Sequence, residues 1–428
     1  MVLDAQRIVG RIAFRTTGRV LAMDIKTRPI VAEESLPFRE AILAGFGEDL
    51  DEESFPPAWF DDLVPLDRTV AAFDGDLIVG TLGAFPFGVT VPGGASISMA
   101  GTTIVTVAAT HRRRGVLTAM MRDHLEDGRR RGEPLVGLWA SESLIYGRYG
   151  FGVATENNAI EIDQTRISIE GESGSVRLVT TEEAIELFPA VYEVERSQRP
   201  GMLSRTGLWW KHHFDDPKAG RDGFSSLRCV LHETDGVADG YAIYRQKSNW
   251  ETGFPDGKIS IRELVAPSAT AHTGLWRFLT TIDLFPQVEY WNLPVDDPLA
   301  WKVPDHRRIK RKRWDALYVR ILDVVQALEA RTYAVDGVVR LTVDDPALPD
   351  AGGSFELAVF EGVGTCRRVD DAETDLGLGT TELASLYLGG NSASAIAKAG
   401  RIRGAEESIV LLGRMFRGDV APWCEEVF

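Results

Sequence analysis

Hydrophobic positions along the first 150 residues switch repeatedly between two periodicities. In some segments apolar side chains recur every three or four residues, as on one face of a helix, and in others they form short runs typical of buried strands. Asp74-Gly75 separates two of these runs and predicts a β-hairpin. Interleaved strands and helices predict a layered fold of the α/β or α+β class. The predicted helices are 36–46 and 116–131, and the predicted strands are 69–73, 77–85, 97–107 and 135–140.

A second region, from about residue 156 to 314, contains an echo of the first. Residues 107–117 read VAATHRRRGVL and residues 265–276 read VAPSATAHTGLW, each between a predicted strand and a predicted helix. This match predicts an internal duplication, with chance similarity as the alternative for so short a segment. The second copy lacks the arginines, so we expect it to be structural.

A third region begins near residue 315 and has its own alternation of runs. We expect it to form a separate compact α+β domain of roughly 110 residues. The predicted elements are a strand leading into a helix over 317–330, strands at 338–343, 354–360 and 363–369, and helices at 380–388 and 392–399.

Composition narrows the possible functions. The 428 residues carry 47 Lys and Arg against 63 Asp and Glu, a net charge of −16, which disfavours nucleic-acid binding because phosphate contacts need clustered positive charge. No apolar run reaches the roughly 18 residues of a membrane span. The 3 cysteines are widely spaced, which predicts neither a disulfide framework nor a metal site and favours a reducing, cytoplasmic environment.

Two basic segments receive no chemical role. Residues 1–23 contain arginines at a spacing of four, and we interpret them as an N-terminal extension rather than a targeting arm. Residues 306–313 form a basic run, which we interpret as a solvated face or a subunit contact.

The strongest chemical signal is the segment TTIVTVAATHRRRGVLTAMM at residues 102–121. A strand is predicted to end at Val107, three arginines occupy the loop, and a helix starts directly after Gly115. A helix N-terminus presents unpaired N–H groups and partial positive charge, and therefore binds phosphates. Glycine lets the backbone approach a ligand closely, and arginines add charge. A basic helix cap without a ligand is the alternative.

This segment resembles the acetyl-CoA-binding motif of the GNAT acyltransferases, in which Arg-x-x-Gly precedes a helix. Leu117 stands where Gly or Ala is usual, as in the Eis (enhanced intracellular survival) aminoglycoside N-acetyltransferases, and THRRRG, SESLIYGRYGFG and SLYLGG are also similar to that family. The resemblance implies an α+β protein with two tandem GNAT-like acyltransferase domains followed by a sterol-carrier-protein-like domain, assembled as a homohexamer. The implied boundaries are 1–23 for the extension, 24–156 for the catalytic domain, 157–314 for a degenerate GNAT-like domain and 315–428 for the C-terminal domain.

The resemblance also implies where acetyl-CoA binds and which groups catalyse, without a metal. Backbone groups of Val105 and Val107 are expected to contact the pantetheine arm. Tyr146 matches the general acid of the family, and the terminal carboxylate of Phe428 matches its general base. Further acetyl-CoA contacts are implied for Thr106, Arg112, Arg113, Arg114, Gly115, Val116, Leu117, Thr118, Ser141 and Glu142.

These groups suit acetyl transfer to an amine. A tyrosine hydroxyl, with a pKa near 10, can protonate a departing thiolate of comparable basicity. A second group must deprotonate the ammonium, and a carboxylate beside the amine can do so. The alternatives are a core aromatic for Tyr146 and a frayed terminus for Phe428, although the apolar residues near the end of the chain favour docking.

The resemblance places the amine pocket near the start of the first domain. Phe46, Glu48 and Trp59 stand at the positions of the aromatic and acidic substrate contacts of the family. Val427 replaces its penultimate glutamate, and we expect Glu426 to make the missing contact. A solvated acidic loop is the alternative interpretation of Glu48 and its acidic neighbours.

We therefore predict an acetyl-CoA-dependent N-acetyltransferase that acts on several amino groups of aminoglycosides or similar polyamines. A protein lysine N-acetyltransferase would use the same groups and is one alternative. A lipid-binding scaffold that uses its C-terminal domain and shows no turnover is the other.

Overall fold

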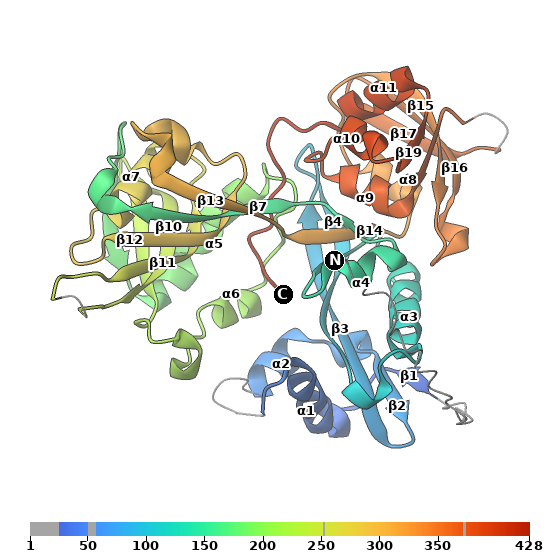
Figure 1. Ribbon diagram of the computed structural model, residues 1–428, viewed down its shortest axis with the longest axis horizontal. Coiled ribbons are helices and arrows are strands. Elements are labelled where there is room, and N and C mark those ends of the chain that lie inside the picture. The colour runs from blue at the N-terminus through green and yellow to red at the C-terminus, as the bar shows by residue number, and fades with distance from the viewer. Residues whose placement is uncertain (1–24, 50–56, 251–252, 371–373) are drawn as a thin grey trace, which may run out of the picture.

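A computed structural model describes residues 25–49, 57–250, 253–370 and 374–428 of the chain. These residues form two seven-stranded sheets and one five-stranded sheet, each with helices packed against it (Figure 1). The predicted N-terminal extension lies outside the described residues. Among the helices that the structure describes, none combines the length and the apolar character of a membrane-spanning segment.

The first sheet has the strand order β1-β2-β3-β4-β5-β14-β6. The hairpin predicted at Asp74-Gly75 is confirmed, with Asp74 as the last residue of its first strand and Gly75-Asp76 as the turn. Gly75 takes the positive φ of 62° that such a turn requires. The predicted helices and strands of this region are also confirmed. The elements are β1 (Lys26–Arg28), α1 (Ser35–Phe46), α2 (Pro57–Leu63), β2 (Ala71–Asp74), β3 (Leu77–Thr90), β4 (Ser96–Val107), α3 (Val116–Arg130), β5 (Leu135–Trp139), α4 (Ser143–Tyr146), β6 (Gly152–Val153) and β14 (Leu317–Ile321).

The second sheet has the order β13-β7-β12-β11-β10-β9-β8 and lies at the left in Figure 1. β11 and α7 follow one another as β4 and α3 do, and both strands end at the valines matched by the sequence echo, Val107 and Val265. The helix starts differ, since Gly115 directly precedes α3 whereas Gly274 lies inside α7. The elements are β7 (Glu156–Asp163), β8 (Ser175–Val179), α5 (Thr181–Arg196), α6 (Gly207–His213), β9 (Arg228–Thr234), β10 (Val237–Lys247), β11 (Lys258–Val265), α7 (Ala269–Leu279), β12 (Gln287–Pro294) and β13 (Ile309–Asp315).

The third sheet, with the order β17-β16-β15-β18-β19, forms the C-terminal domain at the upper right of Figure 1. Leu341, Phe355 and Leu383 are fully buried in its core. Its elements are α8 (Val324–Glu329), β15 (Gly337–Asp344), β16 (Gly353–Phe360), β17 (Val363–Arg368), β18 (Leu376–Gly379), α9 (Thr380–Tyr387), α10 (Ala393–Lys398), β19 (Ile402–Gly404) and α11 (Glu406–Phe416).

The first two sheets exchange strands. β7 follows β6 in the chain but pairs with β12 and β13, whereas β14 follows β13 but inserts between β5 and β6. The prediction that residues 317–321 belong to the C-terminal domain is therefore wrong. Their apolar pattern predicts a buried strand but carries no information on which sheet that strand joins.

Residues 417–428, here called the C-terminal tail, leave the third domain and end between the first two sheets (Figure 1). The tail contains no helix or strand, yet Trp423, Cys424, Glu425 and Glu426 are buried. A buried irregular segment needs specific hydrogen-bond partners, since its backbone groups would otherwise be unsatisfied.

Candidate active site

β4 and β5 are parallel neighbours that pair only at one end. The register joins Met99 to Leu135 and Gly101 to Gly137, and β4 then continues to Val107 without β5. Within the described part of the chain, this edge of β4 pairs with no other strand beyond Gly101. The opening leaves backbone N–H and C=O groups available to an extended ligand.

A β-bulge shapes the end of β4. Ile104 has a positive φ of 49°, and the Thr81 hydroxyl donates to the Ile104 carbonyl oxygen at 2.7 Å. The same hydroxyl lies 2.7 Å from the Thr106 hydroxyl, so the Thr106 side chain is engaged inside the fold. Bulges turn a strand and re-aim its groups. At Thr106 only the backbone therefore remains for a ligand, whereas the side chains of Val105 and Val107 are half-buried.

α3 begins beside this opening with an uncapped N-terminus. Gly115 precedes the helix in the left-handed conformation, with φ 83°, and no side chain caps the first turn. A Cβ placed on Gly115 would meet no atom within 4 Å, so the space in front of the helix is open. The preceding residues Arg112, Arg113 and Arg114 are all exposed, and Arg112 approaches Glu142 at 4.0 Å.

The other predicted acetyl-CoA contacts near the start of α3 differ in how exposed they are. Val116, the first residue of α3, is buried, so its side chain packs in the hydrophobic core. The Thr118 hydroxyl lies 3.1 Å from the Tyr149 hydroxyl. Leu117 is half-buried, and Ser141 is exposed beside Glu142. The exposed surface beside the start of α3 is therefore formed by the arginines of the loop and by Thr118.

Tyr146 lies on the same face of the sheet as α3. Its ring is 8% exposed and packs edge-on against Phe151, with centroids 5.9 Å apart. Burial raises the pKa of its hydroxyl, with further contributions from Glu142 and Tyr149. The hydroxyl therefore stays protonated at neutral pH. Within the described residues, no group hydrogen-bonds to it.

Phe428, the last residue, packs against the middle of the first sheet. Its ring centroid lies 5.0 Å from that of Phe87 and 6.4 Å from that of Phe85. Gly101 makes this approach possible, because a Cβ there would lie 3.0 Å from the Phe428 ring and 2.5 Å from that of Phe87. Since Gly101 is the last residue of β4 that pairs with β5, the chain ends at the opening.

Tyr146 and Phe428 lie on opposite faces of the first sheet. Successive strand residues point to opposite faces. Ala100 belongs to the same hydrophobic cluster as Tyr146, whereas the Cβ position of its neighbour Gly101 faces the Phe428 ring. The opening between β4 and β5 thus separates a tyrosine hydroxyl on one face from the chain terminus on the other.

Aromatic side chains from three parts of the chain surround Phe428. Trp209 of α6 lies edge-on to Phe85 and to Phe87, with centroids 4.9 Å away in both cases. Trp59 of α2 lies edge-on to Phe85 at 6.2 Å. The predicted contact Trp59 therefore belongs to this cluster, and the second domain contributes one wall through Trp209.

Phe46 and Glu48 lie at the C-terminal end of α1. Phe46 is 51% exposed, and Glu48 is exposed directly after Gly47, which ends the helix with φ 79°. The acidic residues that follow Glu48 fall in 50–56, outside the described residues. In the described part of the chain, no ring contact of Phe46 and no ion pair of Glu48 joins either residue to the Phe428 cluster.

Glu426, two residues before Phe428, is held by an ion pair. Its carboxylate accepts from Arg205 Nε at 2.5 Å, and its side chain is only 9% exposed. The expectation that Glu426 contacts the substrate stays a prediction, and one oxygen of its carboxylate is already paired with Arg205 of the second domain. Its backbone carbonyl oxygen accepts from Trp139 Nε1 of β5 at 2.9 Å.

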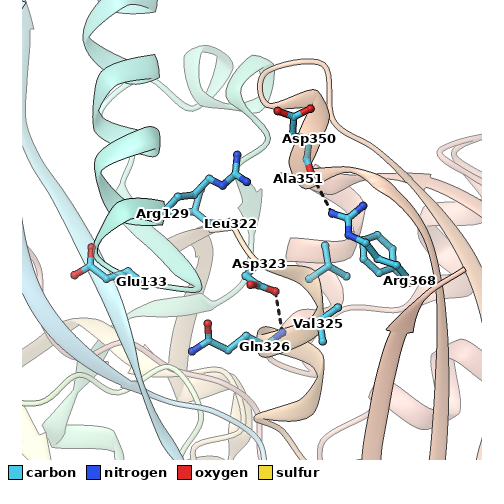
Figure 2. Close-up of a pocket in the computed structure, with 12 residues that line it drawn as sticks. Arg129, Glu133, Leu322, Asp323, Val325, Gln326, Asp350, Ala351 and Arg368 are labelled. Carbon is cyan, nitrogen blue, oxygen red and sulfur yellow. Dashed lines mark hydrogen bonds between the residues drawn. The ribbon is translucent and has the colours of Figure 1, made fainter.

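A cavity of about 320 Å³ lies elsewhere, between the end of α3 and the third domain (Figure 2). Arg129 and Glu133 line it from the first domain, and Arg368 lines it from the third. α3 is roughly 22 Å long by its helical rise, so this cavity is far from Gly115. None of the predicted site residues lines it.

Two comparisons with known proteins bear on this geometry. Acetyltransferase (GNAT) domain models match residues 27–154 and 201–321, and a sterol carrier protein domain model matches 324–425. N-acetyltransferase Eis of Mycobacterium tuberculosis is 35% identical over 88% of this chain and 93% of its own length. The chain belongs to the Eis-like GNAT N-acetyltransferases.

Other similar proteins agree with this assignment to the Eis-like GNAT family. An uncharacterized N-acetyltransferase of Streptomyces avermitilis is 39% identical over 91% of this chain and 96% of its own length. The crystal structure of Eis1 from Mycobacterium abscessus superimposes with a TM-score of 0.82, at 29% identity, over 94% of this chain and all of that one. The predicted order of two GNAT domains and a sterol-carrier-protein-like domain is confirmed.

A GNAT N-acetyltransferase uses acetyl-CoA, and the residues present fit that donor. The open N-terminus of α3 and the exposed arginines suit a pyrophosphate. The unpaired edge of β4 suits the amide groups of a pantetheine arm, which pair with strand backbone.

Sequence reasoning missed several residues of this Eis-like site. Gly101, Phe87 and Trp209 were not singled out, nor was Arg205. A glycine inside a strand often marks the close approach of another group, so Gly101 carried a usable signal. Trp209 and Arg205 lie in the second domain, about 100 residues away in the chain, and no local pattern links them to the first sheet.

Proposed function

We propose that this Eis-like enzyme transfers acetyl groups from acetyl-CoA to several amino groups of an aminoglycoside or a similar polyamine. The observation that carries the proposal is the docking of Phe428 at the opening between β4 and β5, across the sheet from Tyr146. A base on one side of the reacting thioester can deprotonate the attacking amine, and an acid on the other side can protonate the departing thiolate.

In the proposed reaction, the Phe428 carboxylate takes a proton from the substrate ammonium. The freed amine nitrogen forms a bond to the thioester carbonyl carbon, and the carbon–sulfur bond breaks. The Tyr146 hydroxyl donates its proton to the departing thiolate, a role that its raised pKa supports by keeping it protonated. The basic loop Arg112–Gly115 and Thr118 hold the pyrophosphate, with Ser141 and Glu142 at its margin.

The amine would enter from the side of α1 and α2. Glu48 and the protein's net charge of −16 attract polycations. Trp59 offers an aromatic face, and Phe46 at the end of α1 is exposed for contact with a substrate. We also propose the homohexamer of the family for this chain, which sedimentation velocity would check.

The test mixes the protein with acetyl-CoA and a multi-amine aminoglycoside, and follows free thiol together with product mass. Release of thiol with two or more acetyl groups per product is the expected result. A chain extended by one glycine after Phe428 keeps the aromatic ring but moves the carboxylate, and we expect it to lose activity as the Phe428-deleted chain does.

Other outcomes would overturn parts of the proposal. Full activity in the extended and deleted chains would remove the terminal carboxylate from the reaction. Turnover with lysine peptides but not with aminoglycosides would favour protein acetylation. Failure to bind acetyl-CoA would overturn the assignment of Arg112–Gly115 and favour the lipid-binding alternative.

A further inference from the structure

The second GNAT-like domain has its own pair of diverging parallel strands. β11 and β12 pair from Lys258–Gln287 to Ile261–Tyr290, and then separate. This repeats the divergence of β4 and β5. In the first domain the gap between the diverging strands suits acetyl-CoA. What lies in the corresponding gap of the second domain therefore indicates the role of that domain.

The C-terminal tail fills that place. Asn292, two residues beyond the last pair on β12, donates from its side-chain amide to the carbonyl oxygens of Cys424 at 3.1 Å and Glu425 at 3.2 Å. The Trp423 indole donates to the Asn292 carbonyl oxygen at 3.1 Å, and the Trp423 N–H donates to that of Pro200 at 2.8 Å. Backbone groups of Trp423, Cys424 and Glu425 are therefore satisfied by the second domain.

A buried ion pair completes the attachment. Arg205 binds Glu263 of β11 through both terminal nitrogens, at 2.9 and 2.8 Å, and Glu426 through Nε at 2.5 Å. The side chains of Arg205 and Glu263 are 0% and 1% exposed. The guanidinium also lies over the rings of Tyr192 and Trp210, at 4.2 and 4.6 Å. These contacts fix the guanidinium on several sides.

The charges of this cluster depend on one another. Burial alone would raise the pKa of Glu263, but Arg205 and His213 lower it well below its usual value. Glu263 and Glu426 therefore share one guanidinium, and loss of a partner would leave a buried charge unpaired. Such a cluster has one low-energy arrangement, which specifies the position of the tail.

We propose that the second domain is a clamp that positions the terminal carboxylate, with Arg205 as the positioning residue that joins Glu263 to Glu426. Glu426 lies two residues before Phe428, so movement there would shift the carboxylate directly. This inference rests on the proposed role of Phe428 as the base. The clamp itself concerns only where the tail lies, and it can be tested without activity.

The experiment compares the full-length protein with Glu426→Gln and Arg205→Met. Carboxypeptidase A removes a C-terminal phenylalanine only from a chain end that has left its docked position, so the rate of Phe release measures undocking. We expect release to accelerate about 100-fold or more in both variants, because breaking a buried ion pair strongly favours the undocked tail. Glu426→Gln changes one residue of the tail and keeps the shape of the side chain, so we expect this variant to fold even if Arg205→Met does not.

Arg320→Met is the matched control for general destabilisation. Arg320 is as buried as Arg205 and pairs with Asp345, but it lies between the first and third domains. We expect Arg320→Met to lower thermal stability without faster release of Phe428. Faster release in this variant as well would overturn the clamp as a specific device.

Kinetics then separate the clamp from the proposed base. We expect kcat to fall roughly 100-fold in Glu426→Gln, since a displaced catalytic group loses that much, with the KM for acetyl-CoA unchanged. In a chain that lacks Phe428, Glu426→Gln should cause no further loss. Faster release of Phe428 with unchanged kcat would support the clamp but contradict the role of the Phe428 carboxylate as the base. Unchanged release would overturn the clamp, whatever the kinetics show.

Discussion

The two GNAT-like domains have the same arrangement of sheet and helix but treat the strand–helix junction in opposite ways. In the first, α3 starts at Gly115 without a side-chain cap and faces open space. In the second, the Ser268 hydroxyl accepts from the Ala271 N–H at 3.0 Å and caps α7. Beneath α7, a Cβ on Gly274 would lie 2.4 Å from the His232 ring, so that space is filled.

The diverging strands differ in the same way. The opening between β4 and β5 has the Phe428 ring at one side and an unpaired strand edge, whereas beyond the pairing of β11 and β12 Asn292 binds the tail backbone at Cys424 and Glu425. The same fold thus has two uses. What fills the helix N-terminus and the gap between the diverging strands distinguishes the first domain from the second. The first domain can bind a ligand there, and the second binds the end of its own chain.

The largest expected effect comes from Tyr146→Phe, which removes the proposed acid. We expect kcat to fall roughly 10² to 10⁴-fold, the usual contribution of general acid–base catalysis, with acetyl-CoA affinity unchanged. Steady-state thiol release measures this. Tyr244→Phe in the second domain is matched in packing, since Tyr244 lies edge-on to Phe278 at 6.0 Å, and it should keep full activity. Equal losses in the two variants would contradict the assignment.

The second effect concerns acid stability of the first domain. Burial lowers the pKa of His124 to about 4, and its ring bonds to the Thr102 hydroxyl at 2.8 Å. Because the unfolded chain binds this proton near pH 6.5, stability falls as the pH drops from about 6.5 to 4, by about 3 kcal/mol.

We expect His124→Gln to show a correspondingly smaller loss of stability between these pH values in thermal melts. The same variant at pH 8 gives the cost of the altered packing alone, where the histidine is neutral in both states. A parallel decline in the variant and the original protein would show that other groups cause the acid sensitivity.

Two glycines at opposite ends of α3 give a matched pair. Gly115 and Gly132 have φ of 83° and 73°, and a Cβ on either would meet nothing within 4 Å. Alanine at each should cost about 1 kcal/mol of stability through strain. Only Gly115→Ala should weaken acetyl-CoA binding, by roughly tenfold, equivalent to about 1.4 kcal/mol. Calorimetric titration measures the affinity, and equal weakening by Gly132→Ala would refute a ligand at the helix N-terminus.

The smallest effect is expected from Ser268→Ala. Loss of this cap should lower stability by about 1 kcal/mol. It should leave the KM for acetyl-CoA unchanged, because we expect the second copy, which lacks the arginines, to have only a structural role. Chemical denaturation and initial rates check both parts. A change in KM would show that the second helix N-terminus also takes part in binding.

Local structure was largely predictable from the sequence. The amphipathic spacing of α3, the Asp74-Gly75 turn and the strand 317–321 all depend on neighbouring residues, and the structure shows each as an element. The basic loop before Gly115 was recognisable for the same reason, since a strand, a glycine and a helix follow one another directly. The sheet that strand 317–321 joins was not predictable, because pairing depends on distant residues.

By itself, the sequence determined the elements, the duplication and the exposed basic loop, because periodicity and turn chemistry act over a few residues. Only the tertiary structure decided that β7 and β14 change places and that Arg205 pairs with Glu426 across 221 positions. It also decided that Phe428 ends beside Gly101. These contacts join residues that are far apart in the chain, and they form only when three packed domains bring their surfaces together.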